Sequence, residues 1–441
     1  MTTLDPSGSL TATEILAARR ARLGPSLSLA YRTPLHIVRG EGAYLYDADG
    51  RSYLDCVNNV AHVGHAHPRV AEAGIAQMRL LNTNTRYLHE YVVRYAERLT
   101  ALLPDHLEVC FFTNSGSEAN ELALRLARAS TGRPDVATVD VAYHGNTQRL
   151  VEISPYKFDG PGGAGRRDDV HVVPLPDAYR GRHRGDGSAI ADAYLADSRE
   201  ILAIAAATGR APGALIAEAI PGTAGQVVPP AGWLAGLFEA AREVGAVPIA
   251  DEVQVGFGRV GSAVWAFDAQ GARPDIVTMG KPIGNGHPLG AVVTTRAIAD
   301  AFANGMEYFN TFGGNPVSAA IGLAVLDVIA DEDLQEHARV TGERLLAGLH
   351  QVAERHEPIG DVRGAGLFVG FELVRDRSTR DPDADLAAEL VNRAAERGVL
   401  LSTDGLDHNV IKIKPPLVFS DADADRLVET VDTILGELAG A

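Results

Sequence analysis

The stretch Val109-Cys-Phe-Phe-Thr-Asn-Ser-Gly-Ser-Glu-Ala-Asn120 combines an apolar run with the polar start of a helix. A buried strand that runs directly into a helix is half of a βαβ unit. Unpaired N–H groups at the N-terminus of such a helix attract an anion, so Ser115, Gly116 and Ser117 are candidate phosphate ligands. Gly116 also allows the backbone to come close to the anion. An ordinary helix cap at Ser115 would explain the same residues, and this stretch alone leaves both interpretations open.

The alternation of apolar runs and helical patterns continues over residues 76–330, which we expect to form one large α/β domain. Each apolar run is followed by polar residues or glycine, and open parallel sheets bind their ligands at this carboxyl edge. The clearest runs are Ala137–Asp140, Ala214–Ala217, Val247–Ala250 and Ile276–Met279.

The two ends of the chain predict a smaller unit. Residues 331–441 contain short strand patterns separated by a helical stretch, which is typical of a small α+β domain. Residues 1–75 form an N-terminal segment that we expect to contribute to this small domain. Within it, the turn at Asp49-Gly50 between two β-type runs predicts a hairpin.

Composition limits the classes of partner. The chain has 441 residues with 40 basic and 57 acidic side chains, a net charge of −17, which argues against a nucleic-acid partner. Two cysteines cannot build a disulfide framework, and no Cys/His cluster has zinc spacing, so we expect no metal and a reducing compartment. The most apolar uncharged stretch, 309–326, contains asparagine, glycine and proline, which predicts no membrane helix. A cytoplasmic protein fits these features.

Two acids, Asp251 and Glu252, end the apolar run at 246–250. A charge at the end of a buried strand needs a partner. A protonated pyridine nitrogen is a fitting partner, because a carboxylate beside it keeps the ring cationic and able to accept electrons. In extended chain, Val253 would share the face of Asp251 and pack under such a ring. An ion pair between Asp251 and an arginine is the alternative.

Lys281 lies between Gly280 and Pro282 at the end of another apolar run. Its amine would reach the crevice at the carboxyl edge of the sheet, where small neighbours leave room for a covalent adduct. A surface lysine in a loop is the alternative. The combination of an anion-binding helix start, a buried carboxylate and this lysine favours an enzyme with a phosphorylated cofactor.

The stretch Gly256–Gly261 matches the dinucleotide pattern GxGxxG. Its preceding strand ends too early and no amphipathic helix follows, so we interpret it as a turn. A non-catalytic nucleotide-binding module built on this stretch is the alternative from another functional class.

Five motifs in this order resemble the class III aminotransferases, pyridoxal-phosphate enzymes of fold type I. They are Asn114–Asn120, Tyr143-His144-Gly145, Asp251–Arg259, Gly280-Lys281 and Thr311–Pro316. The resemblance implies an α/β fold with a mostly parallel seven-stranded sheet in the large domain, plus the smaller α+β C-terminal domain. It also implies pyridoxal 5'-phosphate as the cofactor and a homodimer, possibly a tetramer, with active sites at the subunit interface.

The resemblance assigns roles to individual residues. Lys281 would bind the cofactor covalently and move the proton in catalysis, and Thr311 would reach the cofactor phosphate of the neighbouring subunit. The remaining cofactor contacts would come from Ser115, Gly116 and Ser117 at the phosphate, Tyr143 and Val253 at the ring faces, Asp251 at the pyridine nitrogen and Gln254 near the ring hydroxyl.

A narrower resemblance points to the phospho-lyase branch, which includes ethanolamine-phosphate and 5-phosphohydroxylysine phospho-lyases. It rests on Asn58–His65, Leu80–Arg86, Ile153–Phe158 and Leu401–Gly405. The implied reaction eliminates phosphate from a phosphorylated amino alcohol, with O-phosphoethanolamine giving acetaldehyde, ammonia and phosphate. An ω-aminotransferase acting on a small amine and a keto acid is the alternative on the same scaffold.

A leaving phosphate needs cationic donors. Arg363 is the first candidate, because it occupies the place where many enzymes of this class bind a substrate carboxylate, and Glu218 would pair with it when no anion is bound. Asn59 is a second candidate substrate contact, and Asn58 and His62 are further candidates for the pocket lining. Weaker candidates, for which a solvated surface charge is the alternative, are Lys157, Arg86, Lys412 and Lys414.

Overall fold

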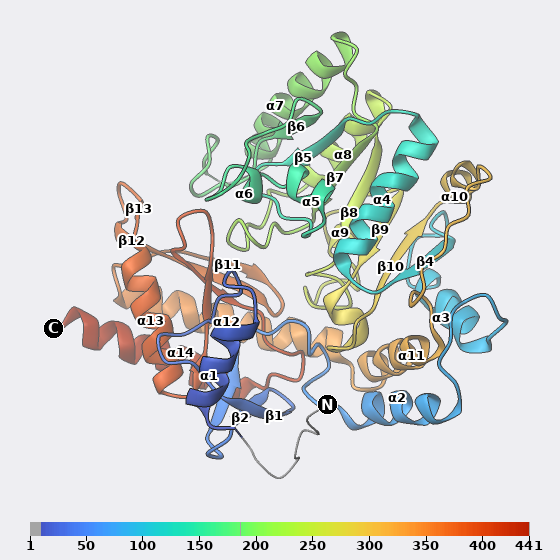
Figure 1. Ribbon diagram of the computed structural model, residues 1–441. Coiled ribbons are helices and arrows are strands. Elements are labelled where there is room, and N and C mark those ends of the chain that lie inside the picture. Colours follow the sequence, from blue (N-terminus) through green and yellow to red (C-terminus); the bar gives the residue numbers. More distant parts are fainter. Residues whose placement is uncertain (1–9, 186, 441) are drawn as a thin grey trace.

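The computed structural model describes residues 10–185 and 187–440, which form three β-sheets flanked by helices (Figure 1). The helices are α1 Ala12–Arg22, α2 Pro68–Leu80, α3 Glu90–Thr100, α4 Gly116–Thr131, α5 Gln148–Ile153, α6 Pro155–Phe158, α7 Ser188–Ala207, α8 Trp233–Glu243, α9 Ala266–Ala269, α10 Arg296–Phe302, α11 Pro316–Asp331, α12 Leu334–Arg355, α13 Ala384–Glu396 and α14 Asp421–Ala439, with a 3₁₀ turn at Lys281–Gly284. The strands are β1 Ile37–Glu41, β2 Tyr44–Asp47, β3 Ser52–Asp55, β4 Val109–Thr113, β5 Val136–Val139, β6 Val170–Val173, β7 Ala214–Glu218, β8 Val247–Asp251, β9 Ile276–Met279, β10 Gly290–Thr294, β11 Ile359–Ala365, β12 Phe368–Asp376, β13 Asp381–Pro382, β14 Val399–Leu400, β15 Ser402–Asp404 and β16 Val410–Ile413.

The largest sheet has seven strands in the order β4-β10-β9-β8-β7-β5-β6. Its pairs are parallel except those of β10, which is antiparallel to both neighbours. This confirms the predicted α/β fold with a mostly parallel seven-stranded sheet. Strands β5, β7, β8 and β9 are buried along their whole length, which is why they occur in the sequence as unbroken apolar runs.

Successive side chains of the central strands enter two different cores. Ala217 and Ala250 belong to one apolar cluster, whereas Ile216 and Ile249 belong to the other. Helix α4 packs against β8, β9 and β10, and helix α8 packs against β7 and β8. Both faces of the sheet are therefore covered, and ligands can enter only at an edge of the strands.

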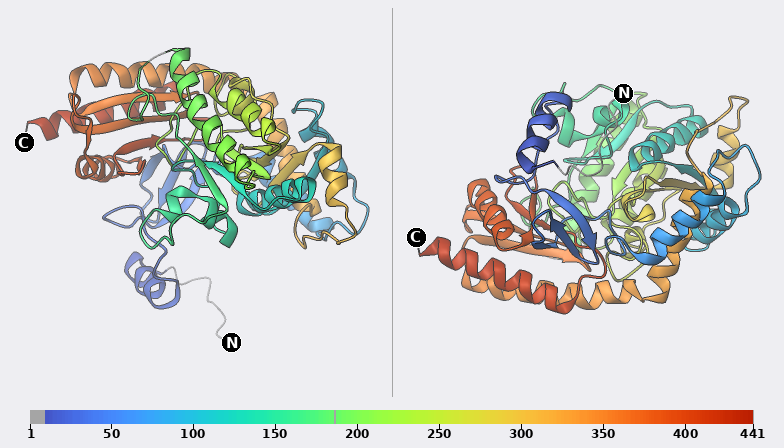
Figure 2. Two further views of the ribbon diagram at one scale, coloured as in Figure 1. Left: turned by 90° about the horizontal axis from the view of Figure 1, so that it is seen from above. Right: turned by 60° about the horizontal axis from the view of Figure 1, so that its bottom comes forward.

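The second unit contains two smaller sheets and its own apolar core. One sheet joins the two ends of the chain, because β3 pairs in parallel with β14, with Leu54 opposite Val399. The hairpin predicted around Asp49-Gly50 is confirmed, since β2 and β3 are antiparallel neighbours. Helices α12 and α14 run side by side along this unit, and α1 stands apart from the body without a buried residue (Figure 2). The domain boundaries near residues 75 and 330 stay predictions.

A buried arginine stabilises the turn that follows β8 through hydrogen bonds. Arg259 is fully buried and its Nη1 donates to the carbonyl oxygens of Leu367 (3.0 Å) and Pro415 (2.8 Å). Its Nη2 lies 3.1 Å from Nδ1 of His62, whose Nε2 contacts the carbonyl of Phe257. Burial lowers the pKa of Arg259 to about 9. The stretch Gly256–Gly261 is a turn in the structure, as predicted, and His62 supports this turn rather than the pocket.

Arg259→Met should lower the free energy of unfolding by about 3 kcal/mol, because two buried carbonyls and the buried His62 nitrogen lose their hydrogen-bond donor. The shift of the urea midpoint measures this effect. The matched control is Arg344→Met, since Arg344 forms an exposed pair with Asp425, and such pairs contribute less than about 1 kcal/mol. Equal midpoints for the two variants would contradict the fastening role of Arg259.

Candidate active site

A cavity of about 400 Å³ lies at the carboxyl edge of the large sheet. It brings together eight of the residues selected from the sequence. They are Ser115, Gly116, Ser117, Tyr143, Asp251, Val253, Gln254 and Lys281. Three residues without a predicted cofactor role, Asn120, His144 and Glu218, complete much of the lining. Thr311 and Arg363 are not part of the lining.

The start of α4 forms one end of the cavity. Ser115 caps the helix, because its Oγ accepts from the N–H of Glu118 at 3.1 Å. Gly116 lies so close to Val253 that a Cβ atom at this position would be 2.7 Å from the Val253 side chain. Ser117 is held by Asn146, whose N–H donates to the Ser117 Oγ at 3.2 Å. The free N–H groups of this 16-residue helix give the cavity an anion-binding end.

Asp251 is buried in the middle of the cavity wall. Its Oδ2 accepts from Asn120 Nδ2 at 2.8 Å and lies 2.8 Å from Nδ1 of His144. The alternative of an ion pair with an arginine is therefore wrong for Asp251. The sequence signal for His144 was its place in the motif Tyr143-His144-Gly145.

Val253 reaches the cavity by a different route from the one expected. The strand β8 ends at Asp251, so Val253 lies in a turn and not in extended chain. The turn is fixed by the N–H of Val253, which donates to Asp251 Oδ1 at 3.1 Å. This turn places the Val253 side chain against Gly116 and in the cavity lining.

Two buried oxygens at the cavity lack a hydrogen-bond partner among the described residues. They are Asn120 Oδ1 and Glu218 Oε1. Burial and the charge of Asp251 raise the pKa of Glu218 to about 7. Unpaired buried polar atoms are costly, so these oxygens indicate a ligand or water in the cavity.

Lys281 follows β9 and adopts a left-handed backbone conformation with φ +38°. Burial lowers the pKa of its amine, while Asp251, Glu218 and Asp404 act in the opposite direction. A larger fraction of the amine is thus neutral and nucleophilic at a given pH. An anion-binding helix start, a buried carboxylate and a nucleophilic amine in one cavity fit a phosphorylated pyridine aldehyde.

Arg363 lies elsewhere. Its Nη1 donates to Asp361 at 2.6 Å and to Glu372 at 3.0 Å, and it lines a separate cavity of about 360 Å³. The predicted pair between Arg363 and Glu218 is wrong, because Glu218 Oε2 instead accepts from the N–H of Gly222 at 3.1 Å. Two carboxylates on its own sheet hold the guanidinium, so the geometry does not favour Arg363 as a ligand in the Lys281 cavity.

Lys412 of β16 and Lys414, which directly follows this strand, lie closer to this cavity than the sequence indicated. Lys414 is almost fully buried, and its Nζ donates to Gln254 Oε1 at 3.3 Å. Asn59 Nδ2 donates to the same oxygen at 3.2 Å. Lys412 and Lys414 alternate with Ile413, and this period of two places both lysines on one face of an extended chain. That alternation was the signal that could have identified them.

The parts of the chain that the structure describes contain no cluster of three or more His, Cys, Asp or Glu residues suited to a metal ion. Within the same residues, no helix has the length and apolar character needed to span a membrane.

Comparisons with known proteins agree with this geometry. A sequence model of the family "Aminotransferase class-III" matches residues 28–435. The chain is 52% identical over 428 residues to "Alanine--glyoxylate aminotransferase 2-like" of Drosophila melanogaster, covering 96% of this chain and 87% of that protein. It is 42% identical over 435 residues to "Ethanolamine-phosphate phospho-lyase homolog 1" of Caenorhabditis elegans, covering 96% and 93%.

Two solved structures are also similar to this chain over nearly its whole length. A phospholyase from Arthrobacter in complex with phosphoethanolamine has a TM-score of 0.91 at 42% identity, covering 96% of this chain and 99% of that one. An (S)-enantioselective ω-transaminase from Thermomicrobium roseum has a TM-score of 0.88 at 30% identity, covering 98% and 99%. These similarities show that the cofactor of the present chain is pyridoxal phosphate. The chain belongs to the class III aminotransferases, a family of pyridoxal-phosphate enzymes of fold type I.

Proposed function

We propose that this enzyme is a phospho-lyase that eliminates phosphate from O-phosphoethanolamine and yields acetaldehyde, ammonia and phosphate. The observation that carries the proposal is the likeness, over nearly the whole chain, to a phospholyase solved with phosphoethanolamine. Among the described residues, the cavity lining contains no arginine, the residue best suited to bind the carboxylate of a keto acid in two parallel hydrogen bonds. The name of the Drosophila relative keeps an aminotransferase as the second candidate.

The proposed cofactor contacts follow the geometry of the cavity. Ser115, Gly116 and Ser117 hold the phosphate at the start of α4, and Asp251 keeps the pyridine nitrogen protonated. Asn120 and His144 orient the Asp251 carboxylate through their hydrogen bonds. Tyr143 and Val253 contact the ring, while Gln254, held by Asn59, lies near the ring hydroxyl.

Lys281 performs the proton transfer in this proposal. Bound pyridoxal phosphate supplies an electron sink that acidifies the C–H bond beside the substrate nitrogen. The Lys281 amine takes that proton. Burial lowers the pKa of this amine, so more of it is neutral and able to act as a base. The C–O bond to phosphate then breaks and phosphate leaves with the electron pair of that bond. Water hydrolyses the remaining enamine to acetaldehyde and ammonia.

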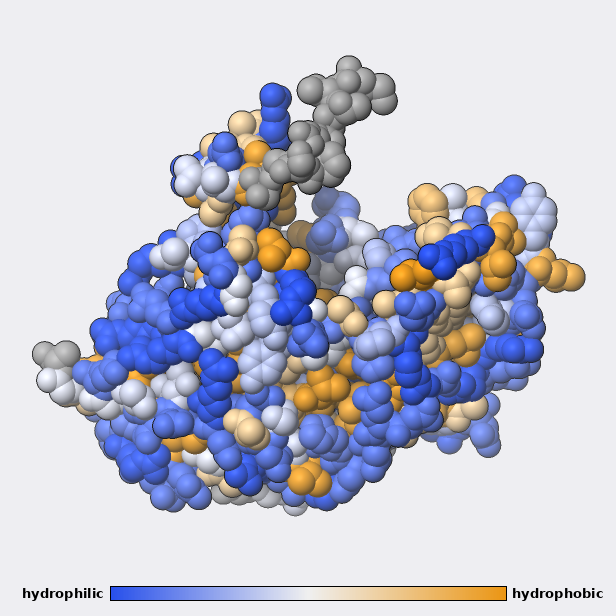
Figure 3. Space-filling view, turned by 90° about the horizontal axis from the view of Figure 1, so that it is seen from below, coloured by the Kyte–Doolittle hydropathy of each residue, from blue (hydrophilic) through white to orange (hydrophobic). Residues whose placement is uncertain are grey.

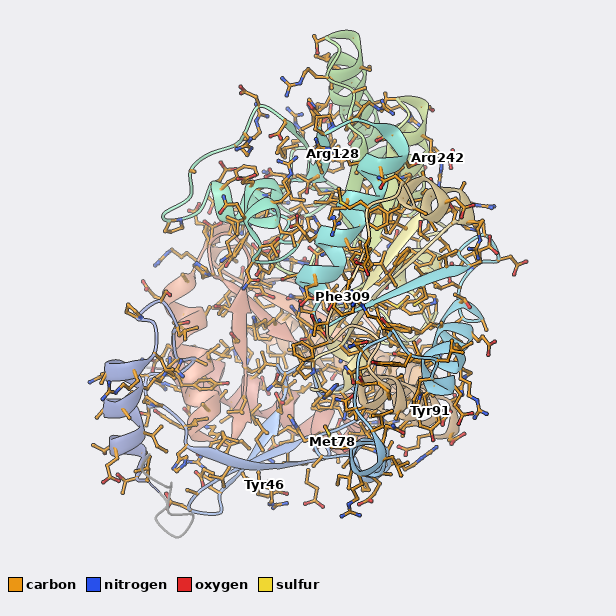
Figure 4. The ribbon with its side chains drawn as sticks, turned by 45° about the vertical axis from the view of Figure 1, so that its right-hand side comes forward. Tyr46, Met78, Tyr91, Arg128, Arg242 and Phe309 are labelled. Atoms are coloured by element: carbon orange, nitrogen blue, oxygen red, sulfur yellow. The ribbon has the colours of Figure 1, made fainter. Side chains whose placement is uncertain are left out.

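We also propose a homodimer built on an exposed apolar patch. The patch consists of Ile75, Met78, Leu80, Leu81, Leu88, Met306, Phe309 and Phe312. Its two segments are adjacent, because Arg86 pairs with Glu307 and lies 4.2 Å over the Phe309 ring. Figure 3 shows apolar side chains among hydrophilic ones on the lower face, and Figure 4 marks Phe309 near one end of α4 and Met78 on α2.

The patch lies beside the active site. Asn310 Nδ2 donates to Glu118 Oε2 at 2.7 Å, which ties the 306–312 segment to the first turn of α4. Thr311 is exposed in the single chain, as a residue that serves a neighbouring subunit would be. Contiguous exposed apolar patches often mark interaction surfaces. A tetramer and a cytoplasmic location stay predictions, and three relatives carry the word "mitochondrial" in their names.

Wild-type enzyme supplied with O-phosphoethanolamine and no keto acid should release phosphate and acetaldehyde in equal amounts over many turnovers. Lys281→Ala should reduce the rate by roughly 10³-fold or more, because the base that takes the proton is lost. A colorimetric phosphate assay and an enzymatic acetaldehyde assay measure both products. A single half-turnover that leaves pyridoxamine phosphate would instead identify an aminotransferase.

The double variant Leu88→Glu/Phe309→Glu should shift the protein from dimer to monomer in sedimentation velocity, because two charges would be buried at the interface of each subunit. The matched control is Ile204→Glu, since Ile204 is an exposed apolar residue of α7 outside the patch. A wild-type monomer, or a double variant that remains dimeric, would refute this interface.

A further inference from the structure

The lysines of this chain have an unusual distribution. Only four of the 40 basic residues are lysines, namely Lys157, Lys281, Lys412 and Lys414. Lys281 lines the cavity, and Lys157 Nζ lies 5.4 Å from the ring centroid of Tyr143, another lining residue. Lys414 touches Gln254 of the lining, and Lys412 shares a carboxylate with Lys414. An otherwise arginine-based chain therefore places its compact, strongly hydrogen-bonding ammonium groups around one cavity.

Lys412, Lys414 and Asp404 form a cluster with an excess of positive charge. The two lysines bind the two oxygens of the single Asp404 carboxylate, at 3.0 and 2.8 Å. The Lys414 side chain is only 4% exposed and its Nζ lies 4.9 Å from the ring centroid of Phe368. Two ammonium groups that share one carboxylate leave the cluster with a net positive charge, and such a charge attracts an anion.

The hydrogen bonds of Lys414 leave it able to bind a ligand. An ammonium group has three N–H donors, and the described residues use two of them, at Asp404 and at Gln254. Burial lowers the pKa of Lys414 to about 8, with Lys412 adding to the effect and Asp404 opposing it. A bound anion would favour the charged form of this amine.

Resting on the proposed function, we propose that Lys414, together with Lys412 and Asp404, is the receptor for the phosphate group of the substrate and sets the preference for phosphorylated amines. The cluster adjoins the cavity through Gln254, whereas Arg363 is held by Asp361 and Glu372 at a different cavity. A phosphate group would offset the surplus positive charge of the cluster and accept the third N–H of Lys414.

Calorimetric titration of the holoenzyme with inorganic phosphate tests this receptor without turnover. Lys414→Met should weaken phosphate binding by about 10- to 100-fold, which is the effect of losing one charge-assisted hydrogen bond. Arg363→Met is the matched control, because it also removes a buried, carboxylate-bound cation, and it should change the affinity by less than about threefold. Lys412→Met, at a more exposed position, is a second test should Lys414→Met fail to fold, and it should also weaken binding.

Steady-state kinetics provide the second readout. Lys414→Met should raise KM for O-phosphoethanolamine far more than it lowers kcat, while the absorbance change of the cofactor on adding unphosphorylated ethanolamine stays as in the wild type. Unchanged phosphate affinity in both lysine variants would overturn the receptor, even if the wild type is an active lyase. Phosphate binding that depends on Lys414 in an enzyme that releases no phosphate would refute the lyase and leave the receptor standing.

Discussion

The buried carboxylate of Asp251 is the interaction on which the site depends. It joins three elements that are distant in sequence, because Asn120 of α4 and His144 of the loop after β5 both bind its Oδ2 at the end of β8. A buried carboxylate without these donors would be strongly destabilised. The same hydrogen bonds that make the charge tolerable also fix the start of α4 opposite Lys281. The same hydrogen bonds thus serve both the stability of the fold and the chemistry of the site, and Asn120 Oδ1 of this network has no hydrogen-bond partner among the described residues.

The small unit places two lysines, Lys412 and Lys414, beside the cavity of the large domain. Every lining residue of the cavity belongs to residues 115–281, yet the nearest surplus of positive charge comes from β15, β16 and the residue after it. Lys414 adjoins the cavity through its hydrogen bond to Gln254, and Arg259 donates to the carbonyl of Pro415, the next residue, which holds this end of β16 against the turn after β8. Under the proposed function, packing between the units therefore places the lysines that would bind the phosphate group of the substrate.

The large sheet and most of the cavity could be predicted from the sequence because their signals are local. Buried parallel strands occur as unbroken apolar runs, and Ser117, Asp251 and Lys281 each lie within five residues of the end of an apolar run. Local signals of this kind could not tell whether Arg363 or Lys414 is the better candidate to bind the substrate phosphate. Whether a cation on a distant strand faces the cavity depends on which carboxylates its own sheet supplies, and Asp361 and Glu372 retain Arg363 while Asp404 leaves Lys414 in excess. Val253 shows the same limit, since one turn after β8 replaced the expected extended chain.

The parallel pair of β3 and β14 has a consequence for biosynthesis. Leu54 leaves the ribosome long before its neighbour Val399 exists. At 5–20 residues per second, roughly 20 to 70 seconds pass before that edge can be closed. During this interval the β1–β3 meander exposes unsatisfied backbone groups, which can pair with other nascent chains. Such delayed closure lengthens the time in which the amino-terminal meander can aggregate.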